Sequence, residues 1–188
     1  VEAYRSGETY GEVNASDPIA IAWDASTSRL FVLDAARHLF AIDTAAVVTP
    51  LALRDAADLR SVSAIAVYVG YLYVLDPDGG QVWRYLPAAD GFDSERTGVL
   101  GAMDLAGSTG LAVDGHVFVL DPPALRRFVQ GREQAPMLQG IDSEPTAAVG
   151  LVEDVLREIL YVADRGGGRI VASDRAGAFL RQYRHPDF

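Results

Sequence analysis

The chain of 188 residues contains no cysteine. This absence excludes disulfides, thiolate nucleophiles and zinc–thiolate sites. Lysine is absent too, so all 16 of the Lys and Arg residues are arginines, and asparagine occurs once, at Asn14. A GC-rich genome is the simplest explanation of this bias. A hot habitat, which disfavours residues that deamidate, is the alternative.

Long apolar runs are missing as well. No run approaches the ~18 residues that a membrane-spanning helix needs, and no basic segment followed by an apolar stretch marks a secretory signal. We therefore predict a soluble domain without membrane insertion, and we leave its compartment open while favouring an extracytoplasmic one. Because the chain begins with Val1 rather than Met, we expect it to be a processed or excised piece.

Basic residues are too few to balance the acidic ones, and the formal net charge is −10. The acidic residues are scattered along the chain, which is typical of a solvated surface. An acidic protein is poorly suited to a phosphate backbone, so no nucleic-acid partner is predicted. A local basic patch is conceivable only around Arg126, Arg127 and Arg132, which lie close together in the sequence.

One short motif occurs four times in the chain. Each copy is an apolar run that ends in an aspartate, and the copies are "RLFVLD", "YLYVLD", "HVFVLD" and "ILYVAD", ending at Asp34, Asp76, Asp121 and Asp164. These aspartates are 42, 45 and 43 residues apart. A nearly constant period of this length indicates a repeat architecture.

Each repeat contains four short runs with a two-residue period, separated by Gly, Asp and Pro, which is typical of strands and turns. A period of roughly 43 residues with four strands predicts a β-propeller blade. The fold class is therefore predicted to be all-β, with about four blades of four antiparallel strands. In the third repeat the fourth strand is expected at Pro136 to Leu138. The segment Val149 to Leu160 could also be drawn as an amphipathic helix, but its alignment with Ile19 to Leu30 favours two strands and a turn.

The first strand of each repeat alternates between small and large residues. Because neighbouring side chains point to opposite faces of a sheet, one face of each blade is expected to be small and the other large. This asymmetry suits blades that crowd together near an axis. The small set is Ala20, Ala22, Ala64, Ala66, Gly110, Ala112 and Gly150; the large set is Ile21, Trp23, Ile65, Val67, Leu111, Val113 and Leu151.

Three stretches resemble a known repeat. "LYVLDPDGGQVWRY" at Leu72 to Tyr85, "GLAVDGHVFVLD" at Gly110 to Asp121 and "LYVADRGGGRI" at Leu160 to Ile170 are similar to the NHL repeat. The turn asparagine of that family is missing, so a looser TolB-like propeller is the alternative. The resemblance implies a β-propeller, most often six-bladed, that serves as a sensory or scaffolding domain of a larger bacterial protein.

Blade number and chain length do not agree for a complete six-bladed ring, which would need about 260 residues. We place the repeats at roughly 18–53, 62–100, 108–138 and 146–184 within a single propeller domain or fragment. Residues 1–17 are expected to be an outer strand and linker from a preceding blade, since "VEAYR" at Val1 to Arg5 resembles "LRQYR" at Leu180 to Arg184. Part of a larger ring is the expectation, and a compact four-bladed ring is the alternative. Open blade faces would favour self-association.

The repeated aspartates are predicted to fasten turns by accepting backbone N–H groups. A ring of Ca²⁺-binding carboxylates is the alternative, but turn carboxylates on separate blades are too far apart to share one ion. Glycines give such turns their positive φ. The predicted turn residues are Asp34, Asp76, Asp121, Asp164, Gly79, Gly80, Gly166, Gly167 and Gly168.

Candidate binding residues lie elsewhere. Asp24, Asp114 and Asp154 end the innermost strands, and they are placed to face a channel mouth. Trp83 and Arg84 are of the types that contact surfaces favour. The histidines His38, His116 and His185 fall in different phases of the repeat and have no metal-ligand spacing, so we predict no catalytic residue and no metal ligand.

A non-catalytic binding or scaffold module is therefore the predicted function, with a protein or a small molecule as its ligand. No cofactor is predicted, and Ca²⁺ is the alternative. Two other functions stay open: a metal-dependent, lactonase-like hydrolase or lyase, and a subunit of a larger assembly whose partners cover the blade faces.

Overall fold

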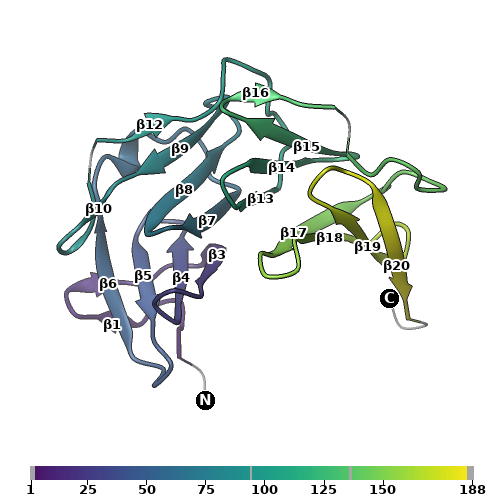
Figure 1. The fold of residues 1–188 in the computed structure, drawn as a ribbon. Helices are drawn as coiled ribbons and strands as arrows, with labels where there is room; N and C mark the ends of the chain where they lie inside the picture. The colour runs from purple at the N-terminus through teal and green to yellow at the C-terminus, as the bar shows by residue number, and fades with distance from the viewer. Residues whose placement is uncertain (1–2, 94, 136, 186–188) are drawn as a thin grey trace. The chain divides into compact units, whose positions relative to one another are not determined.

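The computed structural model describes residues 3–93, 95–135 and 137–185, and these residues form β-strands and one short 3-10 turn, η1 (Ala56–Asp58). The chain divides into two compact units, Val1–Val99 and Leu100–Phe188. Each unit holds two antiparallel meanders of the kind that the sequence predicts (Figure 1). The prediction of an all-β chain built from four-stranded antiparallel sheets is confirmed.

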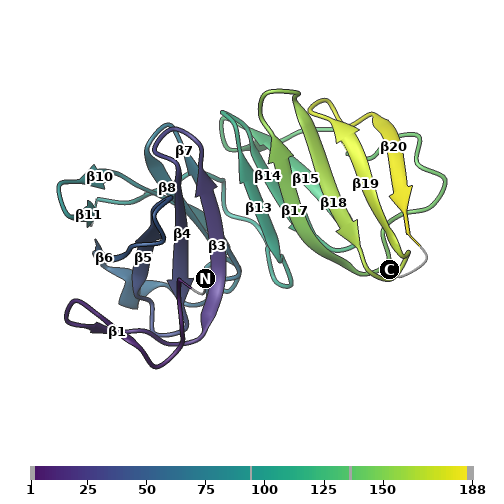
Figure 2. The same ribbon diagram turned by 90° about the horizontal axis from the view of Figure 1, so that it is seen from below.

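In the first unit the four strands of each meander follow chain order. The first meander contains β3 (Pro18–Asp24), β4 (Arg29–Asp34), β5 (Leu39–Ile42) and β6 (Val48–Leu53). The second contains β7 (Ala64–Tyr68), β8 (Tyr71–Asp76), β9 (Gln81–Tyr85) and β12 (Thr97–Gly98). A small hairpin, β10 (Pro87–Ala88) and β11 (Gly91–Phe92), extends the first sheet because β11 pairs in parallel with β6 (Figure 2).

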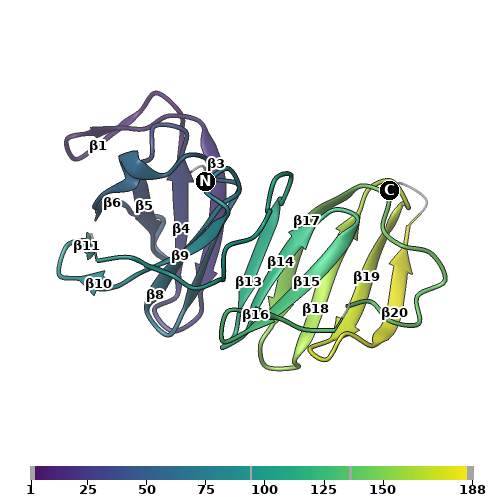
Figure 3. The same ribbon diagram turned by 90° about the horizontal axis from the view of Figure 1, so that it is seen from above.

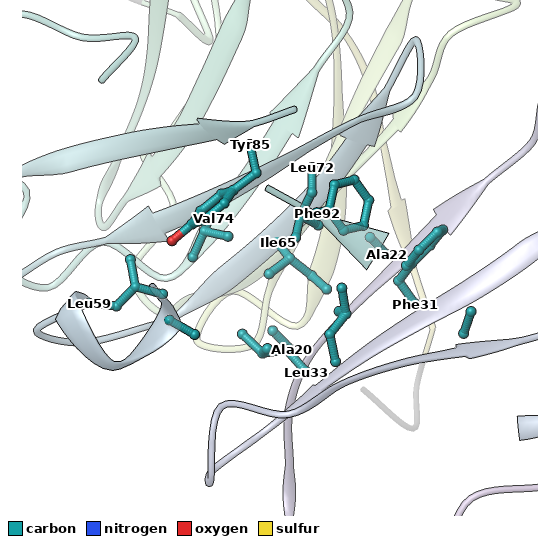
Figure 4. Packing of buried hydrophobic residues seen from close by; sticks show 13 residues of the cluster. Ala20, Ala22, Phe31, Leu33, Leu59, Ile65, Leu72, Val74, Tyr85 and Phe92 are labelled. Atoms are coloured by element: carbon teal, nitrogen blue, oxygen red, sulfur yellow. The ribbon is translucent and has the colours of Figure 1, made fainter. Parts of the chain in front are cut away.

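The core of the first unit lies where its two sheets meet. Ala20 and Ala22 on β3 belong to one cluster with Ile65 on β7 (Figure 4). The other face of β3 carries Ile21 and Trp23, which are exposed. The small set of one inner strand thus packs on the large set of the next, as the alternating pattern predicts.

The second unit repeats this arrangement. Its first meander contains β13 (Gly110–Val113), β14 (Val117–Asp121), β15 (Ala124–Val129) and β16 (Arg132–Glu133). Its second contains β17 (Ala148–Asp154), β18 (Ile159–Asp164), β19 (Arg169–Asp174) and β20 (Phe179–Arg184) (Figure 3). A Cβ atom added to Gly110 would lie 3.1 Å from Leu151 Cβ, so the small residue of β13 is needed for the close approach of β17.

The segment Val149 to Leu160 forms two strands and a turn, and the helical alternative is wrong. The fourth strand of the third repeat was predicted at the wrong place. It is β16, because Gln130 and Gly131 have φ of 51° and 75° and close a tight hairpin directly after β15. Pro136 lies outside the described residues, and Met137 and Leu138 form no strand.

The N-terminal segment differs from the expected outer strand. Ala3 to Arg5 form no strand, and Val1 and Glu2 lie outside the described residues. A hairpin of β1 (Thr9–Tyr10) and β2 (Val13–Asn14) follows instead. The rings of Tyr4 and Tyr10 stack on each other and meet the edge of Phe40, so this segment covers one face of the first sheet.

Candidate functional site

Three of the repeated aspartates are buried and bonded in the same way. Oδ1 of Asp164 accepts the Gly167 N–H in its own turn at 3.1 Å, and also the Thr146 N–H at 3.0 Å. Asp76 is bonded in the same way to Gly79 in its turn and to Ser61. Each carboxylate therefore fastens a turn to the segment that enters the blade. Asp34 likewise accepts the N–H groups of His38 and Ser16.

Asp121 departs from this pattern. Its carboxylate accepts a hydrogen bond from the Arg126 guanidinium at 3.0 Å. The turn that follows it contains Pro122 and Pro123, which have no N–H group to donate. Asp121 therefore binds a side chain at its turn, whereas the other three aspartates bind backbone N–H groups as well as side chains.

The glycines of these turns have two different roles. Only the last glycine of each turn has positive φ, 61° at Gly80 and 57° at Gly168. Of the predicted turn glycines Gly166 to Gly168, only Gly168 gives the turn a positive φ. A Cβ on Gly79 or Gly167 would lie 2.3 Å from Oδ2 of the turn aspartate, so these glycines leave room for the buried carboxylate.

Asp24 and Asp154 lie at hairpin turns and are bonded within them. Asp24 accepts hydrogen bonds from Ser26 and from the Thr27 hydroxyl at 2.6 Å. Burial alone would raise the pKa of Asp24, but the hydrogen bonds from Thr27 and Ser26 lower it below its usual range. The pKa of Asp154 is lowered by its hydrogen bond with Arg157.

Trp83 and Arg84 take part in packing within the first unit. The Trp83 ring packs against the core, and the Arg96 guanidinium lies 4.6 Å from the ring centroid. Arg84 lies over the Tyr71 ring at 5.3 Å. Both side chains are thus engaged by neighbours in their own blade.

Asp114 lies in an electrostatic cluster at the junction of the two sheets of the second unit. Its side chain is fully buried, and Oδ2 contacts Nη2 of Arg175. Its Oδ1 accepts the His116 N–H at 2.9 Å. Arg175 comes from the turn after β19 and also donates to the Asp114 carbonyl at 3.1 Å. The arginine thereby connects the end of β13 to the last blade.

Glu153 on β17 is the second buried carboxyl of this cluster. Its side chain is 4% exposed, and Oε1 lies 3.9 Å from Nε of Arg175. Among the residues that the structure describes, none donates a hydrogen bond to either carboxyl oxygen. Burial, followed by the nearby Asp114 carboxylate, raises the pKa of Glu153 to about 8. At neutral pH Glu153 therefore carries a proton, which can bridge the two carboxyls.

The cluster reaches the surface through one hairpin. Arg175 Nη1 binds Glu158 Oε1 at 2.8 Å, and Glu158 lies in the turn between β17 and β18. On the opposite side of this turn Arg157 donates to Asp154 from its backbone at 3.1 Å and from its guanidinium at 2.7 Å. The β17–β18 turn is thus held at both ends by ion pairs.

The tip of this hairpin is apolar. Leu156 is 95% exposed and Val155 is 52% exposed. Exposed apolar side chains on a well-held turn cannot relieve their contact with water by folding back onto the protein. They therefore form a surface suited to contact with another molecule.

Sequence reasoning predicted Asp114 and Asp154 but missed Glu153, Arg175 and Leu156. A signal for Glu153 was present, because the matching positions of the other repeats hold Trp23, Val67 and Val113. When one repeat has a carboxyl at a position where the others have an apolar packing residue, we expect that carboxyl to be buried and its pKa to be shifted. No comparable signal marks Arg175, whose partners are distant in sequence.

Within the residues that the structure describes, no group of three or more His, Asp or Glu side chains is arranged to hold a metal ion. Over the same residues, no helix has the length and apolarity that crossing a membrane would require.

Comparison with solved structures defines the class of the fold as β-propeller-like. The chain is similar to a structure described as "Streptogramin B lyase structure", with a TM-score of 0.62 and 12% identity over 93% of this chain and 56% of that one. It is equally similar, with a TM-score of 0.62 and 16% identity, to a chain of a nidogen/laminin complex, over 85% of this chain and 61% of that one.

The two matched chains are longer than this one, which spans about three fifths of their length. Identities this low establish the fold and do not extend to activity. No protein-family model and no curated protein matches the chain. The β-propeller-like fold is therefore established, while the NHL-like or TolB-like assignment stays a prediction.

Proposed function

We propose that the chain is a non-catalytic β-propeller module that binds a partner protein through the β17–β18 hairpin. The observation that carries this proposal is the exposure of Leu156, 95%, at the tip of a turn that ion pairs hold at both ends. A pre-ordered apolar side chain loses little conformational entropy when it is buried by a partner. The nidogen/laminin neighbour is consistent with the proposal, since that title describes a protein complex on a related fold.

The buried cluster supports this role rather than a catalytic one. Glu153 has a proton to donate near neutral pH, but its side chain is only 4% exposed. A general acid must lie within hydrogen-bonding reach of its substrate. The buried cluster therefore fixes the position of the β17–β18 hairpin, and the hairpin contacts the partner protein. A sensory or scaffolding place in a larger bacterial protein would fit such a module.

Site-specific photocrosslinking in cells of the source organism tests the proposal. A photoreactive amino acid replaces Leu156 in one variant and Val69 in the control. Val69 is 71% exposed in the turn between β7 and β8 of the first unit, so it matches Leu156 in exposure and setting. We expect a discrete protein adduct from position 156 that is absent from position 69.

The captured protein is then purified and its affinity is measured by calorimetry. Leu156→Asp should weaken binding at least tenfold, as expected when an apolar contact residue is replaced by a charge, whereas Val69→Asp should leave the affinity unchanged. Equal affinities for the two variants, or adducts without preference for position 156, would refute the proposed role of the hairpin.

A further inference from the structure

The two blade junctions inside the units follow one packing rule. In the first unit the small face of β3, with Ala20 and Ala22, packs in one cluster with Ile65 of β7. In the second unit Ala112 of β13 belongs to one cluster with Leu151 of β17. Each blade thus presents a small inner-strand face to the next blade and a large inner-strand face to the one before.

Within the described residues of the first unit, one large inner-strand face has no partner. It is the outer face of β3, which we name the leading face and which consists of Ile19, Ile21 and Trp23. Their side chains are 39%, 63% and 56% exposed. By the packing rule, the surface that covers this face should be apolar and should have small residues along its inner strand.

The last blade offers a face of this kind. We name it the trailing face, and cross-strand pairing defines its members. Gly150 lies opposite Ala163, Ala163 opposite Ile170, and Ile170 opposite Tyr183; Val152 lies opposite Tyr161, Tyr161 opposite Ala172, and Ala172 opposite Arg181 at the edge strand. Val152 is 66% and Tyr183 is 42% exposed. The opposite face of this sheet, with Leu160, Val162 and Val171, is fully buried against the preceding blade.

We propose that the leading face of one copy of this chain packs on the trailing face of a second copy. Small residues at Gly150 and Ala163 would receive Ile21 and Trp23, in the manner in which Gly110 and Ala112 receive Leu151 within the second unit. The contact is heterologous, because the two copies use different surfaces, and such contacts build rings or open chains. Burial of these side chains from water is the driving force.

The mass of the purified 188-residue chain tests the proposal first. One copy has a mass of 20.2 kDa, and we expect sedimentation equilibrium to report at least twice this mass with a dependence on concentration. Trp23→Asp and Val152→Asp should each abolish association, and the control Val69→Asp should not. Since Trp23 and Val152 are both more than half exposed, the monomeric variants should keep the far-ultraviolet circular dichroism of the parent chain.

Mixing the two charged variants distinguishes a heterologous contact from a symmetric one. Trp23→Asp keeps its trailing face and Val152→Asp keeps its leading face, so an equimolar mixture should form a one-to-one dimer and nothing larger. A monomeric parent chain at about 100 µM, a concentration well above a micromolar Kd, would overturn the proposal. So would a mixture that stays monomeric. Neither result would affect the hairpin proposal, whose test uses Leu156.

Discussion

The protonation of Glu153 makes the stability of the second unit dependent on pH. The ordinary pKa of a glutamate is 4.5, and that of Glu153 is raised to about 8, first by burial and then by Asp114. The folded state therefore holds one proton that the unfolded state releases above pH 4.5. Stability falls with rising pH wherever the folded state binds more protons. We expect the free energy of unfolding to decrease from about pH 4.5 to about pH 8 and to level off above that.

The size of this effect follows from the shift in pKa. One pKa unit corresponds to about 1.4 kcal/mol, so the contribution of Glu153 changes by about 1.4 kcal/mol per pH unit in this window. Carboxylates whose pKa is lowered, such as Asp164 and Glu133, act in the opposite direction. Their stabilisation is lost only when the pH falls below about 4, through their folded-state pKa values, so they leave the window from pH 5 to 8 undisturbed.

Hydrogen exchange followed by mass spectrometry is the appropriate assay, because it resolves the two units. Exchange rates of peptides from β17 and β18, corrected for the intrinsic effect of pH, give the free energy of opening at each pH. Peptides from β4 and β8 serve as the internal reference. Trp fluorescence during urea unfolding offers a second reference, since both tryptophans, Trp23 and Trp83, lie in the first unit.

Glu153→Gln is the decisive control. The amide resembles the protonated carboxyl in shape and cannot ionise, so the opening free energy of β17 should lose its slope between pH 5 and pH 8. The variant should be more stable than the parent chain at pH 8 and similar to it at pH 5. An identical slope in the two proteins would refute the assignment of a proton to Glu153.

Four further changes test the described contacts. Arg169→Ala removes the partner of the buried Asp164, 2.9 Å away, and should lower the free energy of unfolding by about 3–5 kcal/mol in urea titration. Gly168→Ala places a side chain at φ 57° and should cost about 1–2 kcal/mol. Gly150→Ala, on strand β17 with 3.7 Å from the added Cβ to the nearest atom, should change the stability by about 1 kcal/mol or less. Arg175→Met should accelerate hydrogen exchange of residues 155–158 at least tenfold, with little change in β15.

Local patterns allowed most of the fold to be predicted. The four "FVLD"-type strands, their turn aspartates and the alternation of small and large residues are all encoded within a few neighbouring residues. Such patterns depend on period-two geometry and on turn chemistry, which act over short distances in the chain. The errors fell where no local signal exists. The short strand β16 contains only Arg132 and Glu133, and neither residue type favours a strand.

The candidate site was harder to predict because its members are far apart in the sequence. Asp114 and Arg175 are 61 residues apart, and nothing near either residue indicates the other. The sequence shows that Val155 and Leu156 are apolar. It does not show that they are exposed, because their exposure depends on the ion pairs that hold the turn away from the core. Exposure is a property of the folded chain, so the sequence pattern alone leaves these residues indistinguishable from packing residues.

One position of the repeat explains why the two units should respond differently to pH. Val67 on β7 and Glu153 on β17 occupy the same place in their inner strands. Val67 packs against the apolar core of the first unit, whereas Glu153 meets Asp114 and Arg175. The first junction is held by apolar burial, which does not depend on protonation. The junction in the second unit depends on the proton of Glu153, whose pKa is about 8. Arg175 connects this junction to the hairpin that carries Leu156. The contact surface that we propose at this hairpin would therefore have a support that titrates near pH 8, and no such group lies at the matching position of the first unit.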